Sequence, residues 1–368
     1  MAKYIWQQKS WPKFTWDLER LIGPLSEAKK AQGNILGQAK HLKLREQAEL
    51  FVEEAMATSA IEGEKLDREG VRSSVARRLG LSTAGMKETP RNGDGVVQVL
   101  VDATTNHTSQ LTQEKLWGWH SVLFPTGYSN MEKIVVADWR QGHEPMRVVS
   151  KKGIHFEAPA ARTLDKEMAK FLKWWNTPDS DLDGILRAAI AHFWFVTIHP
   201  FDDGNGRLAR ALTDMALAQD EKTSMRLYSL SSQIVADRDR YYQVLEATQK
   251  GEGDITEWII WFLELLTASI AKSAVLIERV MYVGDFFSTH GDLELSERQK
   301  KVLRKMLELW PGEFVGGLTN TKYVSMTGVS SETAKRDIKD LVEKKILLPN
   351  EARGRSTSYR INPKSPSV

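Results

Sequence analysis

Hydrophobic positions along the chain recur mostly at helical spacing, which predicts a mainly α-helical protein. The first 85 residues hold long runs of helix-forming residues, in which Gly33 and Gly37 are possible breaks. Residues 135–159 instead mix β-branched residues with glycine and proline, and predict a short hairpin with loops. Four further segments have helix length and an apolar or mixed face: residues 160–176, 181–198, 206–220 and 237–251.

The last part of the chain changes character. Residues 295–309 predict one helix, and residues 318–348 predict a helix, a turn at Gly328 and a second helix that begins at the serine pair 330–331. Residues 347–362 then predict two short strands around a glycine turn. A helix-turn-helix followed by such a hairpin is the pattern of a winged helix.

These patterns divide the chain into three regions. We expect a helical N-terminal domain over residues 1–85, a central domain over residues 110–285 and a winged-helix domain over residues 292–362. Glycine, proline and polar residues concentrate in residues 83–95, which predicts a loop between the first two regions. The predicted fold class is therefore mainly α, with a short β-hairpin in the central domain and a second one at the C-terminal end.

Two segments are apolar enough to raise the question of a membrane. Residues 185–198 are too short to cross a bilayer, and residues 255–277 are interrupted by Glu257, Glu264 and Lys272. We interpret both as buried helices of a soluble protein with no membrane contact. The N-terminal residues lack the apolar core of a signal peptide, so we expect a cytoplasmic location.

Composition narrows the chemistry. The chain has 368 residues and no cysteine, which excludes disulfides, thiolate metal sites and a cysteine nucleophile. The net charge is +3, too small to imply a partner by itself. Residues 296–360, however, hold 14 Lys or Arg against 8 Asp or Glu, a net charge of +6, and the rest of the chain is slightly acidic.

One stretch carries most of the candidate chemistry. The apolar run 185–196 is followed abruptly by "TIHPFDDGNGRLAR", residues 197–210. We expect one helix to end near Ile198 and the next to begin near Asn205 or Gly206. The glycines between them permit a tight turn with exposed backbone N–H groups. Because the first N–H groups of a helix have no partner and lie at the positive end of its dipole, such a turn attracts phosphate.

The side chains around this turn extend the phosphate site. Arg207 is a planar, permanently charged donor, and Arg210, three residues on, lies on the same helix face. Asp203 is a hard oxygen ligand of the kind that holds Mg²⁺ together with substrate phosphates. His199 is a base with an ordinary pKa of about 6.5. Together they could move a phosphorus-centred group onto a hydroxyl, and the chain has no Walker loop.

Residues 199–210, "HPFDDGNGRLAR", match the signature H-x-F-x-[D/E]-G-N-[G/K]-R-x-x-R at every defined position, and the chain resembles the Fic family. The resemblance implies a helical Fic catalytic domain over residues 110–285. It also implies Mg²⁺-dependent transfer of AMP from ATP to a Ser, Thr or Tyr hydroxyl of a target protein or of the chain itself. Pyrophosphate would be released.

The resemblance assigns roles to the matching residues. His199 would be the general base, Phe201 a core anchor and Asp203 the Mg²⁺ ligand. Asn205 and Arg207 would complete the catalytic set with His199. The nucleotide-binding stretch would comprise Gly204, Asn205, Gly206, Arg207, Leu208, Ala209 and Arg210.

A second motif lies far upstream. "TSAIEG", residues 58–63, matches the inhibitory motif [S/T]-x-x-x-E-[G/N] of the same family, with Thr58 and Glu62 on one helical face. The resemblance implies that Glu62 pairs with Arg210, takes the place of the γ-phosphate and repels the triphosphate. The motif precedes the catalytic core, so the chain resembles the subclass inhibited from an N-terminal helix.

The resemblance reaches other segments with less specific matches. Met146 and Val148 lie where Fic proteins carry a flap that aligns the target backbone. Tyr241 and Tyr242 lie where the family has an adenine-pocket aromatic, and because they differ by about 100° around a helix we expect one of them, Tyr242, to face the site. His192, on the apolar helix, is interpreted as a core histidine. The family also leads us to expect a homodimer.

Alternatives stay open at this stage. The predicted winged helix carries Lys335, Arg336 and Lys339 on its second helix, and Arg353 and Arg355 in its wing. These residues could contact DNA phosphates, so the chain could be a DNA-binding regulator with a nucleotide-sensing Fic core. A third hypothesis is a Fic enzyme that removes AMP, with Glu62 positioning a water. The two motifs do not distinguish addition from removal.

Overall fold

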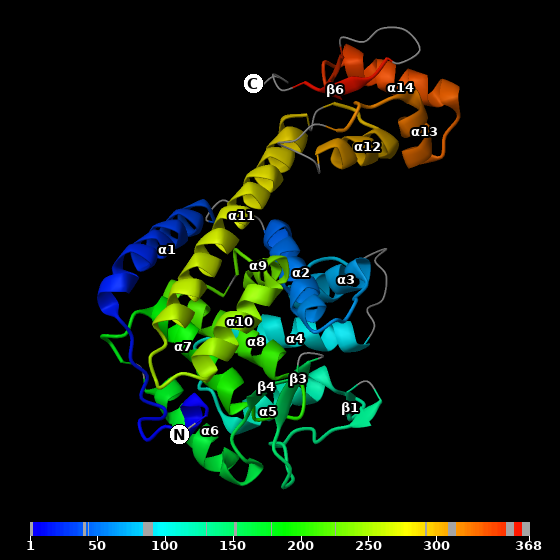
Figure 1. The fold of residues 1–368 in the computed structure, drawn as a ribbon. Coiled ribbons are helices and arrows are strands. Elements are labelled where there is room, and N and C mark those ends of the chain that lie inside the picture. Colours follow the sequence, from blue (N-terminus) through cyan, green and yellow to red (C-terminus); the bar gives the residue numbers. More distant parts are fainter. Residues whose placement is uncertain are drawn as a thin grey trace. The chain divides into compact units, whose positions relative to one another are not determined.

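The structure is a computed structural model, and helices form most of it (Figure 1). It describes residues 3–39, 42, 44–83, 91–129, 131–150, 153–177, 179–224, 226–290, 293–307, 314–350 and 357–362. The chain divides into two compact units, residues 1–274 and 275–368. The long helix α11 crosses the boundary between the two units.

The first unit contains a bundle of helices and two short hairpins. Its helices are α1 (Leu18–Ala39), α2 (Leu44–Ile61), α3 (Arg68–Arg78), α4 (Arg91–Thr105), α5 (Gln113–Leu123), α6 (Leu164–Asn176), α7 (Gly184–Ile198), α8 (Asn205–Glu221), α9 (Leu230–Ala236), α10 (Arg238–Gln249) and the first part of α11 (Thr256–Thr289). Short 3₁₀ turns lie at Ile5–Gln7 and Ala161–Thr163. The strands pair antiparallel as β1 (Tyr128–Ser129) with β2 (Glu132–Lys133) and β3 (Arg147–Ser150) with β4 (Gly153–Glu157).

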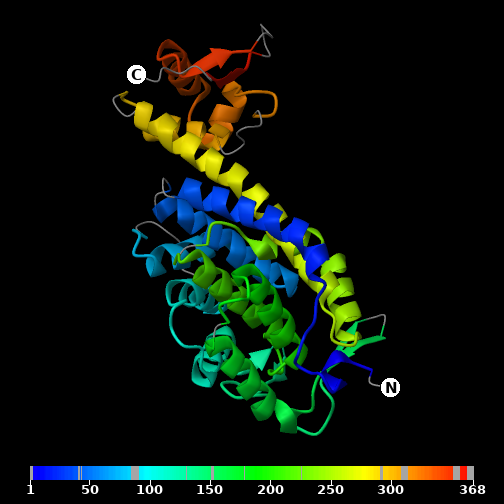
Figure 2. The same ribbon diagram turned by 90° about the vertical axis from the view of Figure 1, so that its left-hand side faces the viewer.

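Helix α7 is the centre of this unit. Thirteen of its residues, Ile185 to Ile198 except Arg187, are buried, which explains why the segment reads as apolar on every side. It packs along α8, whose inner residues are also buried. Helix α2 lies against α8 and α9, and so brings the N-terminal region to the motif. In Figure 2, α1 (blue) runs alongside the first part of α11, where Arg20 pairs with Glu257 at 2.6 Å.

Two sequence expectations about loops were wrong. Helix α1 continues through Gly33 and Gly37, because neither glycine is placed where the chain must turn. The predicted loop at 83–95 ends earlier, since α4 begins at Arg91. Gly95 in this first turn packs directly on α5: a Cβ there would lie 2.0 Å from the Val122 carbonyl oxygen. The glycine that suggested a loop therefore serves close helix packing.

The second unit combines helices α12 (Glu297–Leu307), α13 (Asn320–Thr327) and α14 (Ser331–Glu343) with the antiparallel pair β5 (Leu347–Pro349) and β6 (Tyr359–Ile361). Gly328 turns between α13 and α14 with φ of +72°, and Ser330 caps α14. Val302, Tyr323 and Leu341 belong to its buried core. Arg353 and Arg355 lie outside the described residues, so the winged-helix assignment stays a prediction.

Among the described residues, one helix is long and apolar enough to cross a membrane by length and composition. This helix is α11, and 53% of its most apolar window is buried inside the structure. A buried core helix passes the same test, so the finding by itself is weak evidence for a membrane span.

Candidate functional site

The loop between α7 and α8 has a tightly braced backbone. Helix α7 ends at Ile198, and the next residue, His199, adopts the left-handed conformation with φ of +52°. Gly204 precedes α8 with φ of +82°, and a Cβ there would lie 2.8 Å from the ring of Phe124. The Asn205 side chain closes the loop: it accepts from the Phe201 N–H at 3.0 Å and donates to the Phe201 carbonyl at 2.8 Å. Both the backbone angle and the neighbouring ring therefore require glycine at position 204.

His199 faces this loop as a neutral base. Its Nδ1 lies 3.2 Å from the Val196 carbonyl oxygen, so Nδ1 carries the proton and Nε2 keeps a lone pair. Burial lowers the pKa of His199 to about 4, against the smaller opposing effect of that hydrogen bond. The Arg140 Nε donates to the His199 carbonyl at 2.8 Å and holds the backbone in place. At neutral pH, His199 is therefore ready to accept a proton.

Helix α8 begins at the anion-attracting turn. Its N-cap is Gly204, and Asn205, Gly206 and Arg207 form its first turn. The sequence expectation that Leu208 and Ala209 contact nucleotide is limited by their burial: both are 0% exposed. Their side chains therefore belong to the core, and their helical position can matter only through the backbone. Phe201 is fully buried and stacks on His120 with ring centroids 4.1 Å apart.

The upstream motif reaches this turn from α2. Glu62 Oε1 lies 2.6 Å from Arg210 Nη2, in a pair where the arginine is 3% exposed and the glutamate 27%. Arg210 also donates through Nε to the Thr58 hydroxyl at 2.7 Å and through Nη2 to the Thr58 carbonyl at 3.1 Å. A Cβ on Gly206 would lie 2.5 Å from Glu62 Oε1. The Glu62 carboxylate thus lies at the start of α8, where helix N–H groups favour an anion.

A second carboxylate, which sequence reasoning missed, faces the other arginine of the motif. Glu64 Oε1 lies 2.9 Å from Arg207 Nη1. The one sequence signal for the contact between Glu64 and Arg207 is the position of Glu64, two residues after Glu62. Sequence reasoning also missed His120, whose Nε2 lies 3.2 Å from the Asp203 carbonyl oxygen, and Arg140, because residues that brace a loop from distant elements leave no local pattern.

Asp203 is the one motif carboxylate suited to Mg²⁺. Its side chain is 40% exposed, and its Oδ2 accepts from the Ser129 hydroxyl and lies 3.8 Å from Arg207 Nη2. The neighbouring Asp202 instead accepts from the Val135 N–H at 2.9 Å. No cluster of three or more His, Asp or Glu that could hold a metal occurs among the described residues. The donor set fits a cation that takes its remaining ligands from phosphates and water.

These residues line a groove of about 1000 Å³. Its walls come from the turn after α2, the β3–β4 hairpin, the motif loop, α8 and α10. The lining includes Glu62, Met146, Val148, His199, Asp203, Asn205, Gly206, Arg210, Tyr241 and Tyr242. Tyr242 is 38% exposed, whereas Tyr241 is buried and its hydroxyl lies 3.1 Å from His192 Nε2. His192 is a buried, hydrogen-bonded core residue, as predicted, and it also contacts the Thr213 hydroxyl at 2.9 Å. We call this the motif groove.

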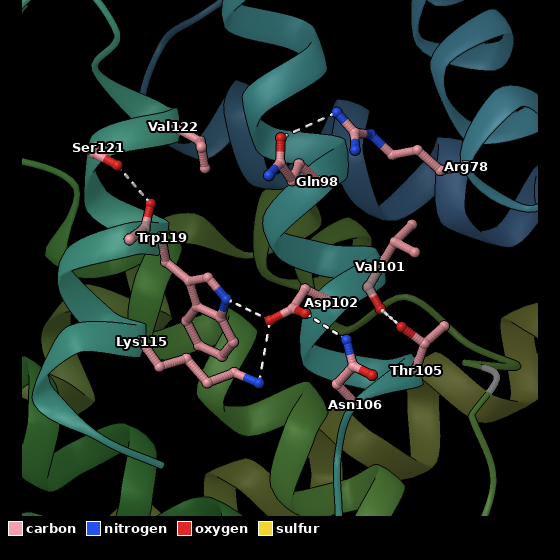
Figure 3. Close-up of a pocket in the computed structure, with 11 residues that line it drawn as sticks. Arg78, Gln98, Val101, Asp102, Thr105, Asn106, Lys115, Trp119, Ser121 and Val122 are labelled. Atoms are coloured by element: carbon pink, nitrogen blue, oxygen red, sulfur yellow. Dashed lines mark hydrogen bonds and ion pairs between the residues drawn. The ribbon is translucent and has the colours of Figure 1, made fainter. Parts of the chain in front are cut away.

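A second open groove, of about 740 Å³, lies between α3, α4 and α5. Figure 3 shows Asp102 at its centre, bonded to the Trp119 indole N–H at 2.7 Å, the Lys115 ammonium at 3.2 Å and the Asn106 amide at 2.6 Å. On its wall, Arg78 donates to Gln98 at 3.1 Å. These polar groups bond to one another across three helices. We call this the helix groove.

Comparison with known families gives two matches. Residues 110–217 match the family model described as "Fic/DOC family". Residues 4–81 match a model described as a domain of unknown function, DUF4172.

Curated relatives agree with the first match. A "Protein adenylyltransferase Fic" from Nematostella vectensis is 36% identical over 102 residues, 27% of this chain and 22% of that protein. A "Protein adenylyltransferase fic-1" from Caenorhabditis elegans is 29% identical over 150 residues, 40% of this chain and 27% of that protein. The matched stretch thus spans about a quarter of the length of these relatives.

Solved structures extend the likeness at the level of the fold. A Fic family protein from Desulfovibrio desulfuricans G20 matches with a TM-score of 0.56 and 18% identity, covering 96% of this chain and 98% of that chain. A Fic-domain signalling protein from Bacteroides thetaiotaomicron matches with a TM-score of 0.50 and 17% identity over 70% of this chain and 97% of that chain. Residues 110–217 are thus similar to the Fic/DOC family by the family model and to Fic adenylyltransferases by sequence, and the two solved structures share the fold.

Proposed function

We propose that this protein is an autoinhibited adenylyltransferase that moves AMP from ATP to a hydroxyl of a target protein or of itself. The observation that carries the proposal is the juxtaposition of His199 with the start of α8. A neutral imidazole, a helix N-terminus and two buried arginines line or adjoin one groove. The family match and the adenylyltransferase relatives support the same chemistry.

The proposed reaction follows from these positions. The triphosphate binds at the start of α8, with Arg207 and Arg210 as its cations. The target hydroxyl attacks the α-phosphorus while His199 Nε2 takes its proton. The new bond joins the hydroxyl oxygen to phosphorus, the bond from the α-phosphorus to the bridging oxygen breaks, and pyrophosphate leaves. Asp203 would hold Mg²⁺, which neutralises polyphosphate charge when bound.

The contact between Glu62 and Arg210 supports autoinhibition. Burial alone would lower the pKa of Arg210, but the charge and hydrogen bond of Glu62, together with Tyr241 and Tyr242, outweigh it and hold that pKa above its ordinary value. With Nε and Nη2 of Arg210 bonded to Thr58 and Glu62, a γ-phosphate at this arginine would lie beside the negative charge of Glu62 and be repelled by it. We infer that Glu62 excludes the productive pose of ATP, and that a Glu62→Gly variant frees Arg210.

The test uses Mg²⁺ and ATP labelled at the α- or the γ-phosphorus. We expect label on protein from the α position alone, stronger in Glu62→Gly than in the unaltered chain. His199→Ala should lower the transfer by about 10²–10⁴-fold, because a general base contributes that factor. His143→Ala, which removes an exposed histidine, is the matched control and should transfer normally.

Two outcomes would contradict this proposal. Label from the γ position would mean phosphoryl transfer, and full transfer by His199→Ala would remove the base from the mechanism. Removal of AMP is tested separately. The labelled Glu62→Gly chain is freed of ATP and mixed with unlabelled unaltered chain. Loss of label would then favour the AMP-removing alternative.

A further inference from the structure

The turn that follows α2 carries two carboxylates toward two arginines. Glu62 pairs with Arg210, and Glu64 pairs with Arg207. We propose that Glu64 is a second inhibitory carboxylate, which keeps Arg207 from the nucleotide as Glu62 keeps Arg210. The inference rests on the proposed function, since it assigns Arg207 to the polyphosphate.

The ion pair at Arg207 is buried on the side of the arginine and incompletely bonded, while the Glu64 side chain is 36% exposed. The arginine side chain is 5% exposed and lies over the ring of Phe124, at 4.8 Å from its centroid. Glu64 meets it through one oxygen, at 2.9 Å. Arg207 Nε and Glu64 Oε2 are both buried and have no hydrogen-bond partner among the described residues. A guanidinium binds best when two of its N–H groups face two oxygens, so this pair leaves binding capacity unused.

This incomplete pairing favours exchange for phosphate. A buried donor without a partner destabilises the state that contains it. The Nε–H of a guanidinium points to the same side as one N–H of Nη2, so a phosphate group could face Nε and Nη2 of Arg207, whereas Glu64 satisfies Nη1 alone. Glu64 therefore neutralises the cation in the resting state without matching its full donor geometry. Such a contact suits a displaceable blocker better than a permanent structural tie.

The backbone explains how one turn presents both carboxylates. The Glu64 N–H donates to the Ser59 carbonyl at 3.0 Å, and the Gly63 N–H donates to the Ala60 carbonyl at 3.0 Å. These two bonds, with Gly63 at φ of +82°, form a Schellman turn at the end of α2. Gly63 reverses the chain direction, so Glu62 and Glu64 reach different arginines of α8. A residue with a side chain at position 63 would have to adopt the left-handed conformation, which favours glycine or asparagine.

Sharing one turn couples the two contacts. A triphosphate that binds both arginines meets the negative charge of both carboxylates, and movement of residues 62–64 would withdraw them together. Removing either charge should then weaken the hold of the other. We expect each single variant to tighten ATP binding, and the double variant to gain less than the sum of the two effects.

The test measures ATP binding rather than transfer. All variants carry His199→Ala, which prevents turnover, and the dissociation constant of Mg²⁺-ATP is measured by calorimetry. We expect Glu64→Gln to tighten binding about tenfold, the factor that about 1.4 kcal/mol represents. Glu69→Gln removes an exposed carboxylate that pairs with Arg72, and as the matched control it should leave binding unchanged. Adding Arg207→Ala should abolish the gain from Glu64→Gln.

The outcomes separate this inference from the proposed function. Unchanged or weaker binding in Glu64→Gln, beside tighter binding in Glu62→Gly, would overturn the role of Glu64 alone. Weaker binding would mean that Glu64 orients Arg207 for the nucleotide. Failure of every variant to bind ATP would instead contradict the proposed function. Thermal melting of each variant shows whether the fold is intact.

Discussion

The motif groove and the helix groove are both open, polar and rich in charge, yet their charges are compensated in different ways. In the helix groove, Asp102 of α4 receives bonds from α5 and from Asn106 just after α4, and Arg78 of α3 bonds to α4. Each group there connects neighbouring elements of the fold. In the motif groove, the carboxylate that meets Arg210 comes from the turn after α2, as does the one that meets the adjacent Arg207 most closely, at 2.9 Å. Asp203 of the motif loop lies farther from Arg207, at 3.8 Å.

The difference teaches which cations are available to a ligand. Polar groups that bond across several packed helices can be released only by separating the helices, and such a groove stabilises the fold. Cations neutralised by one turn can be released by a local movement of that turn. The size of a groove does not distinguish the two cases, but the origin of the counter-charges does.

The largest expected effect is a difference in AMP transfer between variants of two arginines, Arg207 beside the motif groove and Arg78 in the helix groove. Arg207→Ala should lower AMP transfer in the Glu62→Gly background by about 10²–10³-fold, because it removes a preorganised charge from the phosphates. Arg78→Ala should leave transfer intact and lower the melting temperature. Label transfer and thermal melting of both variants check this. Loss of transfer in Arg78→Ala would mean that the helix groove takes part in catalysis.

A second expected effect concerns acid. Because the pKa of His199 is lowered to about 4, His199 stays neutral from pH 8 down to about 5 and becomes protonated below pH 4. Histidine NMR titration, assigned with His199→Ala, should show its transition near pH 4. A midpoint near 6.5, the ordinary value, would contradict the burial of its ring in the resting site.

Substitutions in the helix groove should instead lower the stability of the fold. Asp102→Ala leaves the Trp119 and Lys115 donors without their acceptor, and should lower the free energy of unfolding by about 1–2 kcal/mol. Burial alone would raise the pKa of Asp102, but bonds from Asn106, Trp119 and Lys115 outweigh it and lower that pKa. The contribution is therefore present above pH 4 and lost as pH falls through the folded-state pKa.

Denaturant unfolding at pH 7 and at low pH measures this effect. Glu132→Ala, an exposed carboxylate of β2, is the control and should unfold like the unaltered chain. If Asp102→Ala had normal stability but reduced AMP transfer, the helix groove would serve the reaction and not the stability of the fold.

The smallest expected effect concerns α14. Lys335 pairs with Glu332 at 3.3 Å and Lys339 with Glu343 at 3.6 Å, both on the exposed helix surface. If α14 binds DNA, neutralising Lys335 and Arg336 should lower the salt dependence of binding by about one unit of slope for each phosphate that the variant no longer neutralises. A gel shift on duplex DNA across salt concentrations checks it. No shift at low salt would retire the DNA hypothesis.

Much of the helical architecture could be predicted from the sequence. The end of α7 at Ile198, the start of α8 at Asn205 and the turn at Gly328 follow from local patterns of apolar residues, caps and glycines. The start of α4 was missed because the glycine at 95 serves packing against α5, which no local pattern reveals. The two-residue strands β1 and β2 are too short to leave a periodic signal.

The sequence by itself determined the chemistry of the motif: a base, a carboxylate, a phosphate-attracting turn and two arginines lie within twelve residues, and short-range spacing places them together. Tertiary structure decided the protonation, burial and ion-pair partners of these residues. Burial lowers the pKa of His199 and so makes it a weaker base than a free histidine. The packing of α8 places the side chains of Leu208 and Ala209 in the core. Tertiary structure also brought Glu64 to Arg207, 143 positions away. Only the packing of α2 against α8 could decide that contact, because charge pairing between distant segments depends on which surfaces the folded chain brings together.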